Sequence, residues 1–237
     1  MSPAVLLAAE GGEIHIGKHW TVSLLGFTLN LDTIIATLVA GAIVIGLGLW
    51  VARRASVGKP TKLQIAFEVT KEQIEQQVED NLGIRTAPWV VPFAFAIALL
   101  ILFSNLLAIL PSEEWLPPPT ADVNLTFGLS FVVMLAVWFT AIKRHPVRFF
   151  AHFKNPMAII EEITKPISLS LRLFGNVLSG VIMIQLIILL FPVWLFWVPF
   201  TAWKLFDIFI AVLQAVIFTI LTIIYFGQAL AEESDAH

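Results

Sequence analysis

The sequence predicts an all-α integral membrane protein with about five membrane-spanning helices, one amphipathic interfacial helix, and a last pair of long helices that form a tilted hairpin. Of its 237 residues, 58% are hydrophobic and only 13% are charged, whereas soluble domains carry about 25% charged residues. The mean hydropathy is +0.88. The apolar residues also come in uncharged runs of about 20 residues, the length that crosses a bilayer as a helix.

We expect these helices to form a single polytopic membrane domain over residues 1–237, because a helical bundle in a bilayer folds as one unit. The expected order begins with an external N-terminal segment at 1–27. The expected spans are 28–52, 88–110, 122–143, 156–191 and 199–231, and the amphipathic surface helix is 61–82.

The first span and the segment after it differ in polarity. The span carries small side chains, spaced so that a second helix could approach closely. Residues 61–82 mix apolar side chains with many charges, which is typical of an amphipathic helix at the membrane surface. A soluble loop helix is an equally good interpretation of 61–82. The small residues of the first span are Ala36, Ala40, Ala42 and Gly46.

Prolines mark the connections in the second half of the chain. Residues 111–122 combine prolines, which disfavour a helix, with acids, which disfavour hydrocarbon, so we expect an extramembrane turn there. Pro192 and Pro199 indicate the turn between the last two helices. Each of these helices is longer than the ~30 Å hydrocarbon layer requires, so each must tilt or begin outside it. Pro166 lies in the first of them and is a candidate kink.

Lysine and arginine predict the orientation. They gather in the connection after the first span and in the connection after the third, while residues 111–121 and 192–199 contain none. The positive-inside rule then places the N-terminus outside and both basic connections in the cytoplasm. With five spans, the C-terminus also lies in the cytoplasm. The first residues do not resemble a cleaved signal peptide, because they lack a basic region.

Several classes of function are excluded by composition and motifs. The chain contains no cysteine, which excludes disulfides, thiolate metal sites and cysteine nucleophiles. It also lacks the glycine-rich nucleotide-binding motifs. We therefore expect no cofactor, no bound metal and no nucleic-acid partner.

Two lines of polar residues run through the last two apolar tracts. At 100° per residue, the polar side chains of the first tract fall within about 100° of one another, and those of the second within about 80°. One line contains a cation, Arg172, and the other an acid, Asp207. The first line consists of Glu161, Lys165, Ser168, Arg172, Gly175, Asn176 and Ser179, and the second of Lys204, Asp207, Gln214, Thr222 and Tyr225.

The charged members of these lines are more informative than the neutral ones. Hydroxyls such as Ser168, Ser179 and Thr222 often serve only to join membrane helices. A charge at a helix centre costs about 2.5–3.5 kcal/mol on insertion scales and usually faces a wet cavity or an ion pathway. Arg172 and Asp207 therefore indicate an ion pathway, with a silent ion pair between them as the alternative.

Three stretches resemble one known family. "KPISLSLRLFGN", "LQAVIFTILTIIYFGQAL" and "FSNLLAILP" are similar to subunit a of the bacterial F-type ATP synthase membrane sector. The resemblance implies a bacterial inner-membrane subunit that is not catalytic alone. It lies against a ring of c subunits, with b-type peripheral stalk subunits as further partners in the lipid bilayer, and it conducts protons.

The resemblance also implies roles for individual residues. Arg172 is the charge barrier between two aqueous half-channels and faces the carboxylates of the rotating ring. Family members commonly carry His or Glu nine residues after this arginine, where this chain has Val181, so relay work falls on Asp207 with water or other neighbours. The implied proton path comprises Asp207, Gln214, Asn176, Ser168, Ser179, Tyr225 and Lys204.

The chemistry of arginine suits this barrier. Its pKa exceeds about 12, so it cannot pass a proton on, and its charge favours the ionised form of a nearby carboxylate. Two other classes of function stay open at this point: a secondary transporter or ion-channel subunit with an Arg/Asp pathway, and a purely structural membrane scaffold. A transporter built from inverted repeats is disfavoured, because the sequence shows no internal repeat.

Overall fold

The computed structural model describes residues 21–24, 27–56, 58–82, 87–108, 119–144, 146–147, 149 and 156–231. The expected external segment up to residue 20, most of the acidic turn and the C-terminal tail lie outside these residues. Within the described residues, five helices are long and apolar enough to cross a membrane. The predicted all-α membrane fold is confirmed.

The described residues begin with a small element that the sequence did not predict. Strands β1 (Thr21–Leu24) and β2 (Phe27–Asn30) pair as an antiparallel hairpin, immediately before the first long helix. The remaining elements are α2 (Leu31–Arg54), α3 (Lys62–Leu82), α4 (Val90–Leu107), the 3-10 turn η1 (Pro119–Ala121), α5 (Val123–Arg144), α7 (Pro156–Leu190) and α8 (Trp197–Ala231).

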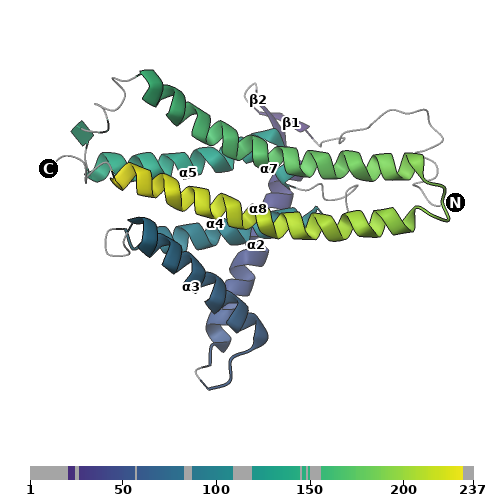
Figure 1. Cartoon of the computed structure of the whole chain (residues 1–237), viewed down its shortest axis with the longest axis horizontal. Helices are drawn as coiled ribbons and strands as arrows, with labels where there is room; N and C mark the ends of the chain where they lie inside the picture. Colours follow the sequence, from purple (N-terminus) through teal and green to yellow (C-terminus); the bar gives the residue numbers. More distant parts are fainter. Residues whose placement is uncertain are drawn as a thin grey trace.

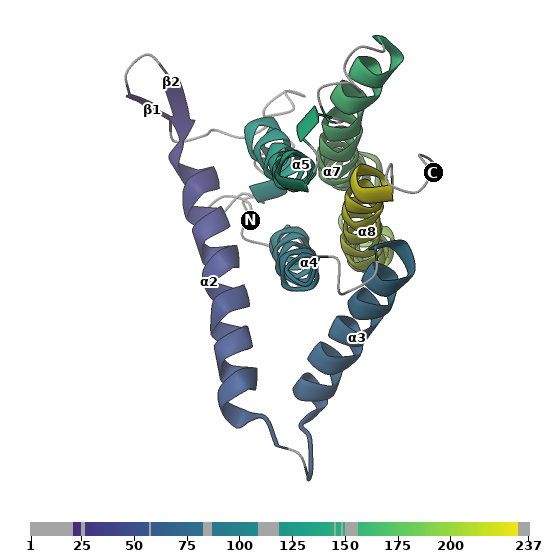
Figure 2. The same ribbon diagram turned by 90° about the vertical axis from the view of Figure 1, so that its left-hand side faces the viewer.

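The long helices run in two directions. Helices α4, α5, α7 and α8 lie alongside one another, whereas α2 runs across them (Figure 1). Viewed along the four aligned helices, α2 and α3 form a V that encloses α4, and α7 and α8 lie on the side away from α2 (Figure 2). Helices α7 and α8 have 35 residues each, about 52 Å of helix. That length exceeds the ~30 Å hydrocarbon layer, so both helices must be strongly tilted if they lie within it.

Small side chains bring α2 against the bundle, but only near its N-terminus. Ala36 and Ala40 are fully buried, and this permits the close approach that small residues allow between membrane helices. Ala42 and Gly46 are exposed, so no helix among the described residues packs against them as predicted. Asp32 in the first turn and Arg53 with Arg54 in the last complement the helix dipole.

Helix α3 is amphipathic, as predicted, and its apolar side packs against the bundle. Ile74 and Val78 are buried in a cluster with residues of α4 and α8. Gly227 of α8 permits the close contact, since a Cβ at this position would lie 3.2 Å from the backbone oxygen of Asn81. The amphipathic character of α3 therefore serves packing on other helices at least in part.

Helices α4 and α8 form the centre of the bundle. Phe218 and Phe226 of α8 are fully buried, and Trp89, Phe93 and Phe226 contact one another edge to face with centroids 5.2–5.9 Å apart. Lipid tails are as apolar as these side chains, so close packing rather than the hydrophobic effect holds such a centre together in a membrane.

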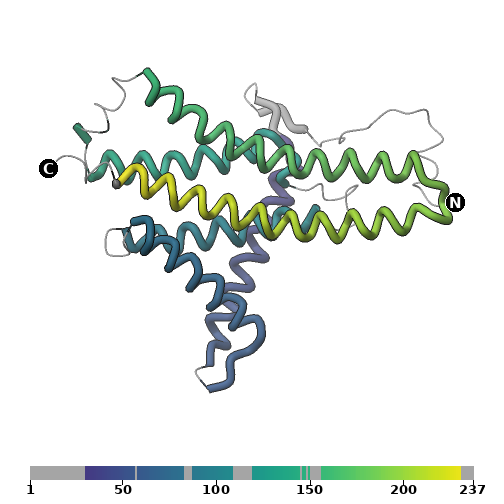
Figure 3. Tube along the Cα trace, viewed as in Figure 1, coloured from purple at the N-terminus to yellow at the C-terminus, as the bar shows by residue number. Residues whose placement is uncertain are grey.

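Proline interrupts neither α7 nor α8. The Cα trace of α7 is continuous but changes direction between its two ends (Figure 3), and Pro166 lies inside the helix. Helix α8 begins at Trp197, two residues before the expected start, and Pro199 lies in its first turn. A proline is tolerated there because the first amide groups of a helix have no partner within the helix.

Candidate functional site

Arg172 lies on a face of α7 that no other described part of the chain covers. Leu171 is 54% exposed and Leu186 is 42% exposed, and Arg172, Ser168, Gly175 and Ser179 are exposed as well. Helix α7 itself lies on the side of the molecule away from α2 (Figure 2). The exposed apolar side chains of α8 do not all continue this face, because Val212 and Val216 border a pocket with residues of α3 and α4. We call the exposed residues of α7 around Arg172 the open face.

The polar line of α7 turns from the open face toward α8 as it proceeds along the helix. Arg172, Asn176 and Gly180 are four residues apart, so they lie on neighbouring turns of one side of α7. Arg172 is exposed, Asn176 is partly buried and Gly180 is buried. The predicted stripe therefore begins at the surface and ends in the α7–α8 interface.

A small cavity with polar side chains in its mostly apolar wall lies at that end of the stripe. Its volume is about 30 Å³, and it is bordered by Asn105, Asn176, Gly180, Val181 and Asp207, among others. Such a cavity has room for about two water molecules. The absence of a side chain at Gly180 keeps the space beside the acid, because a Cβ there would lie 3.4 Å from Oδ1 of Asp207.

The cavity brings together some expected residues and one that was not singled out. Asp207 and Val181, which the resemblance pairs, both border it. Asn105 of α4 was quoted only as part of a motif, yet it is 3% exposed and borders the same cavity. Its Oδ1 accepts a hydrogen bond from Thr120 Oγ1 at 2.9 Å, while its Nδ2 is buried with no partner among the described residues. An amide inside an apolar run was the signal that could have identified it.

A second polar group lies on the other side of Arg172 along α7. Lys165 Nζ is 2.7 Å from Glu162 Oε1 and 3.3 Å from Glu161 Oε1. Glu162 Oε2 also accepts a 2.6 Å hydrogen bond from Trp138 Nε1 of α5. The ammonium group lies 5.7 Å from the centre of the Tyr225 ring, and Tyr225 is close enough to interact electrostatically with Arg172. Along α7, Arg172 thus lies between the cluster around Lys165 on one side and the Asp207 cavity on the other.

The remaining predicted polar residues have varied surroundings. Lys204 Nζ donates to the backbone oxygen of Ala108 at 3.5 Å, at the C-terminal end of α4, where a cation complements the helix dipole. Gln214 is 4% exposed and its Nε2 has no partner among the described residues. The hydroxyls of Ser179 and Thr222 bond to backbone oxygens of their own helices, those of Asn176 and Phe218, so the structure gives them no link between helices.

The alternative of a silent ion pair does not fit these positions. Asp207 lies beside Gly180, eight residues beyond Arg172 and therefore about 12 Å further along α7. Within the described residues, Arg172 forms neither a hydrogen bond nor an ion pair. The part of the chain that the structure describes therefore supplies no partner of the kind that a lipid-facing charge would need.

Known proteins resemble this chain over nearly its whole length. A family model described as "ATP synthase A chain" matches residues 34–227. A protein of Acidothermus cellulolyticus named "ATP synthase subunit a" is 42% identical, over 95% of this chain and 88% of that protein. Proteins of the same name from Mycobacterium leprae and Desulforamulus reducens are 41% and 33% identical, over 96% and 93% of this chain and 97% and 86% of theirs.

Proposed function

The chain belongs to the ATP synthase A chain family, and from this premise we propose that α7 and α8 conduct protons past Arg172 to the carboxylates of a rotating c-ring. Family membership makes the chain a multi-pass membrane subunit of a bacterial ATP synthase, which transports protons and is not catalytic alone. Membership favours this function over a secondary transporter and over a structural scaffold.

The Asp207 cavity is the proposed end of the outer half-channel. Asp207 supplies a carboxylate that can accept and release a proton, and Asn105 and Asn176 supply amides that can orient water beside it. Water bound in this cavity of about 30 Å³ can carry a proton between such groups. Val181 adds no polar atom, so the relay depends on Asp207 and the water that the amides hold.

The group around Lys165 is the proposed start of the inner half-channel. Glu161 and Glu162 form ion pairs with the Lys165 ammonium group. The hydroxyl group of Tyr225 interacts electrostatically with both Lys165 and Arg172. Carboxylates and a phenol at this position can transfer protons from the c-ring to water. The two half-channels then lie on opposite sides of Arg172 along α7.

Arg172 is proposed to separate the two half-channels and to meet the ring carboxylate. A guanidinium cannot release a proton at physiological pH, so it interrupts the proton path. An exposed cation within a membrane helix is costly in lipid, and a carboxylate on a second protein removes this cost by pairing with it. The ring carboxylate loses its proton near Arg172 and regains one at the other half-channel. Rotation of the ring is therefore tied to proton flow.

The proposed surroundings follow from the family and from the distribution of charge. The c-ring occupies the open face, and b-type stalk subunits hold the chain in the complex. The positive-inside rule places Ser56, after α2, in the cytoplasm and Asn124, at the start of α5, outside. Both positions are exposed and the chain has no cysteine, so single cysteines placed there can be labelled selectively. Labelling of both from the same side would overturn this orientation.

The observation that carries the proposal is the position of Arg172, exposed on the open face and unpaired within the described chain. In assembled complexes, Arg172→Ala and Arg172→Lys are expected to abolish ATP synthesis, the latter because a lysine can lose its proton. Leu171→Ala, on the same exposed face, is the matched control and is expected to retain synthesis. Coupled synthesis by assembled Arg172→Ala complexes would refute the proposal.

A further inference from the structure

The Asn105 amide is held at one end only. Thr120 Oγ1 donates a 2.9 Å hydrogen bond to its Oδ1, and Nδ2 at the opposite end has no partner within the described chain. Asn105 is 3% exposed and Thr120 is 1% exposed, so bulk water cannot compensate for a lost bond. An unpaired buried N–H costs free energy unless bound water or another group meets it.

We propose that Thr120 is a positioning residue, which holds the Asn105 amide so that its NH₂ group serves the Asp207 cavity. This inference rests on the proposed function of that cavity in proton uptake. An ionised carboxylate accepts hydrogen bonds only, so the NH₂ group is the end of the amide that can support Asp207, directly or through a water. The hydroxyl of Thr120 satisfies the other end.

Removal of this hydroxyl leaves the amide without a fixed orientation. If a methyl group replaces the hydroxyl, the end of the amide that faces it loses its partner, whichever way the amide is turned. The amide then competes for the cavity's water instead of orienting it toward Asp207. The expected loss is that of one ordinary hydrogen bond, about fivefold in an equilibrium.

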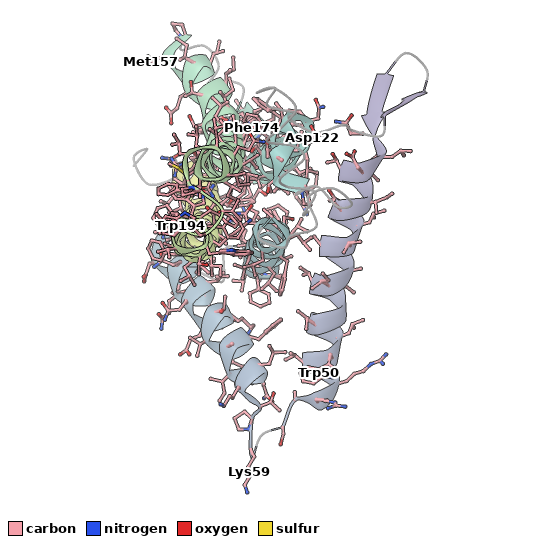
Figure 4. The ribbon with its side chains drawn as sticks, turned by 90° about the vertical axis from the view of Figure 1, so that its right-hand side faces the viewer. Trp50, Lys59, Asp122, Met157, Phe174 and Trp194 are labelled. Atoms are coloured by element: carbon pink, nitrogen blue, oxygen red, sulfur yellow. The ribbon has the colours of Figure 1, made fainter. Side chains whose placement is uncertain are left out.

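The turn that carries Thr120 is itself fixed in place. Asp122, directly after η1, accepts a 2.8 Å bond from the backbone N–H of Asn124 and so caps α5. Its other oxygen accepts bonds from Asn30 Nδ2 at 2.6 Å and Thr33 Oγ1 at 3.0 Å. Figure 4 shows Asp122 at the end of α5 toward α2. The anchored turn gives the Thr120 hydroxyl a defined position against α4.

The test uses the complete ATP synthase in native membranes, with ATP synthesis at a fixed proton gradient divided by the amount of assembled complex. Thr120→Val has nearly the same shape and lacks the hydroxyl, and we expect it to reduce synthesis about fivefold. Thr120→Ser keeps the hydroxyl and should restore most of the activity. Asn105→Leu should reduce synthesis by a similar factor, and adding Thr120→Val to it should change nothing further.

Three results would overturn the inference: full synthesis per complex in Thr120→Val, equal loss in Thr120→Val and Thr120→Ser, or an undiminished effect of Thr120→Val in the Asn105→Leu background. The last result would indicate a structural role independent of the amide. Asp207→Asn separates this inference from the proposed function. Normal synthesis in both Asp207→Asn and Thr120→Val would refute the proposed proton path through the cavity. Normal synthesis in Thr120→Val alone would refute only the role of Thr120.

Discussion

The open face around Arg172 and the cavity around Asp207 give a charged side chain opposite surroundings. Arg172 is exposed on α7, and the described chain provides it with no ion pair or hydrogen bond. Asp207 lies in the α7–α8 interface beside two amides and a cavity of about 30 Å³. Arg172 and the position of Asp207 beside Gly180 are only about 12 Å apart along the axis of α7.

The difference indicates what each charge is for. A group that must exchange protons needs water and polar neighbours, and the chain places Asp207 beside two amides and a cavity that can hold water. A group that must meet a passing carboxylate needs an open approach and no competing partner, and the chain leaves Arg172 exposed. An intramolecular ion pair would satisfy both charges and would remove both functions. Each of the following variants changes one region and leaves the other intact.

The largest effect within the cavity is expected from Asp207→Asn. The variant keeps the shape of the side chain and removes the titrating group, so proton uptake should fall about tenfold. This is less than the 10²–10⁴ typical of a lost acid–base group, because the waters and amides remain. Synthesis and ATP-driven pumping should stay coupled, since Arg172 is untouched. Asp207→Glu should retain much of the activity.

Proton flux and the amount of complex must be measured in the same membranes to interpret Asp207→Asn. The ion-pair reading predicts low assembly with full flux per complex, because the partner cation would be left unpaired. The relay predicts normal assembly with reduced flux. Full flux per complex would therefore contradict the role of the cavity.

A smaller effect is expected from Gly180→Ala. The added methyl group would lie 3.4 Å from Asp207 Oδ1, which is tight but tolerable, and it would take space from the water. We expect flux per complex to fall about twofold, with little change in assembly. Gly46→Ala on α2, where a Cβ meets nothing within 4 Å, is the control. Equal flux in the two variants would show that the cavity's volume does not limit proton uptake.

The sequence predicts the helices well because the membrane restricts the alternatives. Each long apolar run must satisfy its own backbone, so it forms a helix, and the 100° step then places Arg172 and Asn176 on one side of α7. The resemblance to the family also led to Asp207 and Val181, which the structure places around one cavity.

Contacts between helices and connecting turns could not be predicted in the same way. The bond between Thr120 and Asn105 depends on how η1 folds against α4, and periodicity says nothing about turns. The pairing of Trp138 with Glu162 joins α5 to α7, although no spacing rule relates these positions. The β1–β2 hairpin was missed because the apolar pattern before α2 reads as part of the external segment and the first span.

The central claim is that the open face of α7 meets the c-ring, and a photo-crosslinking phenylalanine analogue tests it most directly. Leu186 of α7 is 42% exposed on the open face, and Leu135 of α5 is 46% exposed on another helix, so the two positions match in side chain and exposure. In the intact complex, we expect the analogue at position 186 to form an adduct with a c subunit and the analogue at position 135 to form none. An adduct with c from position 135, and none from position 186, would contradict the account.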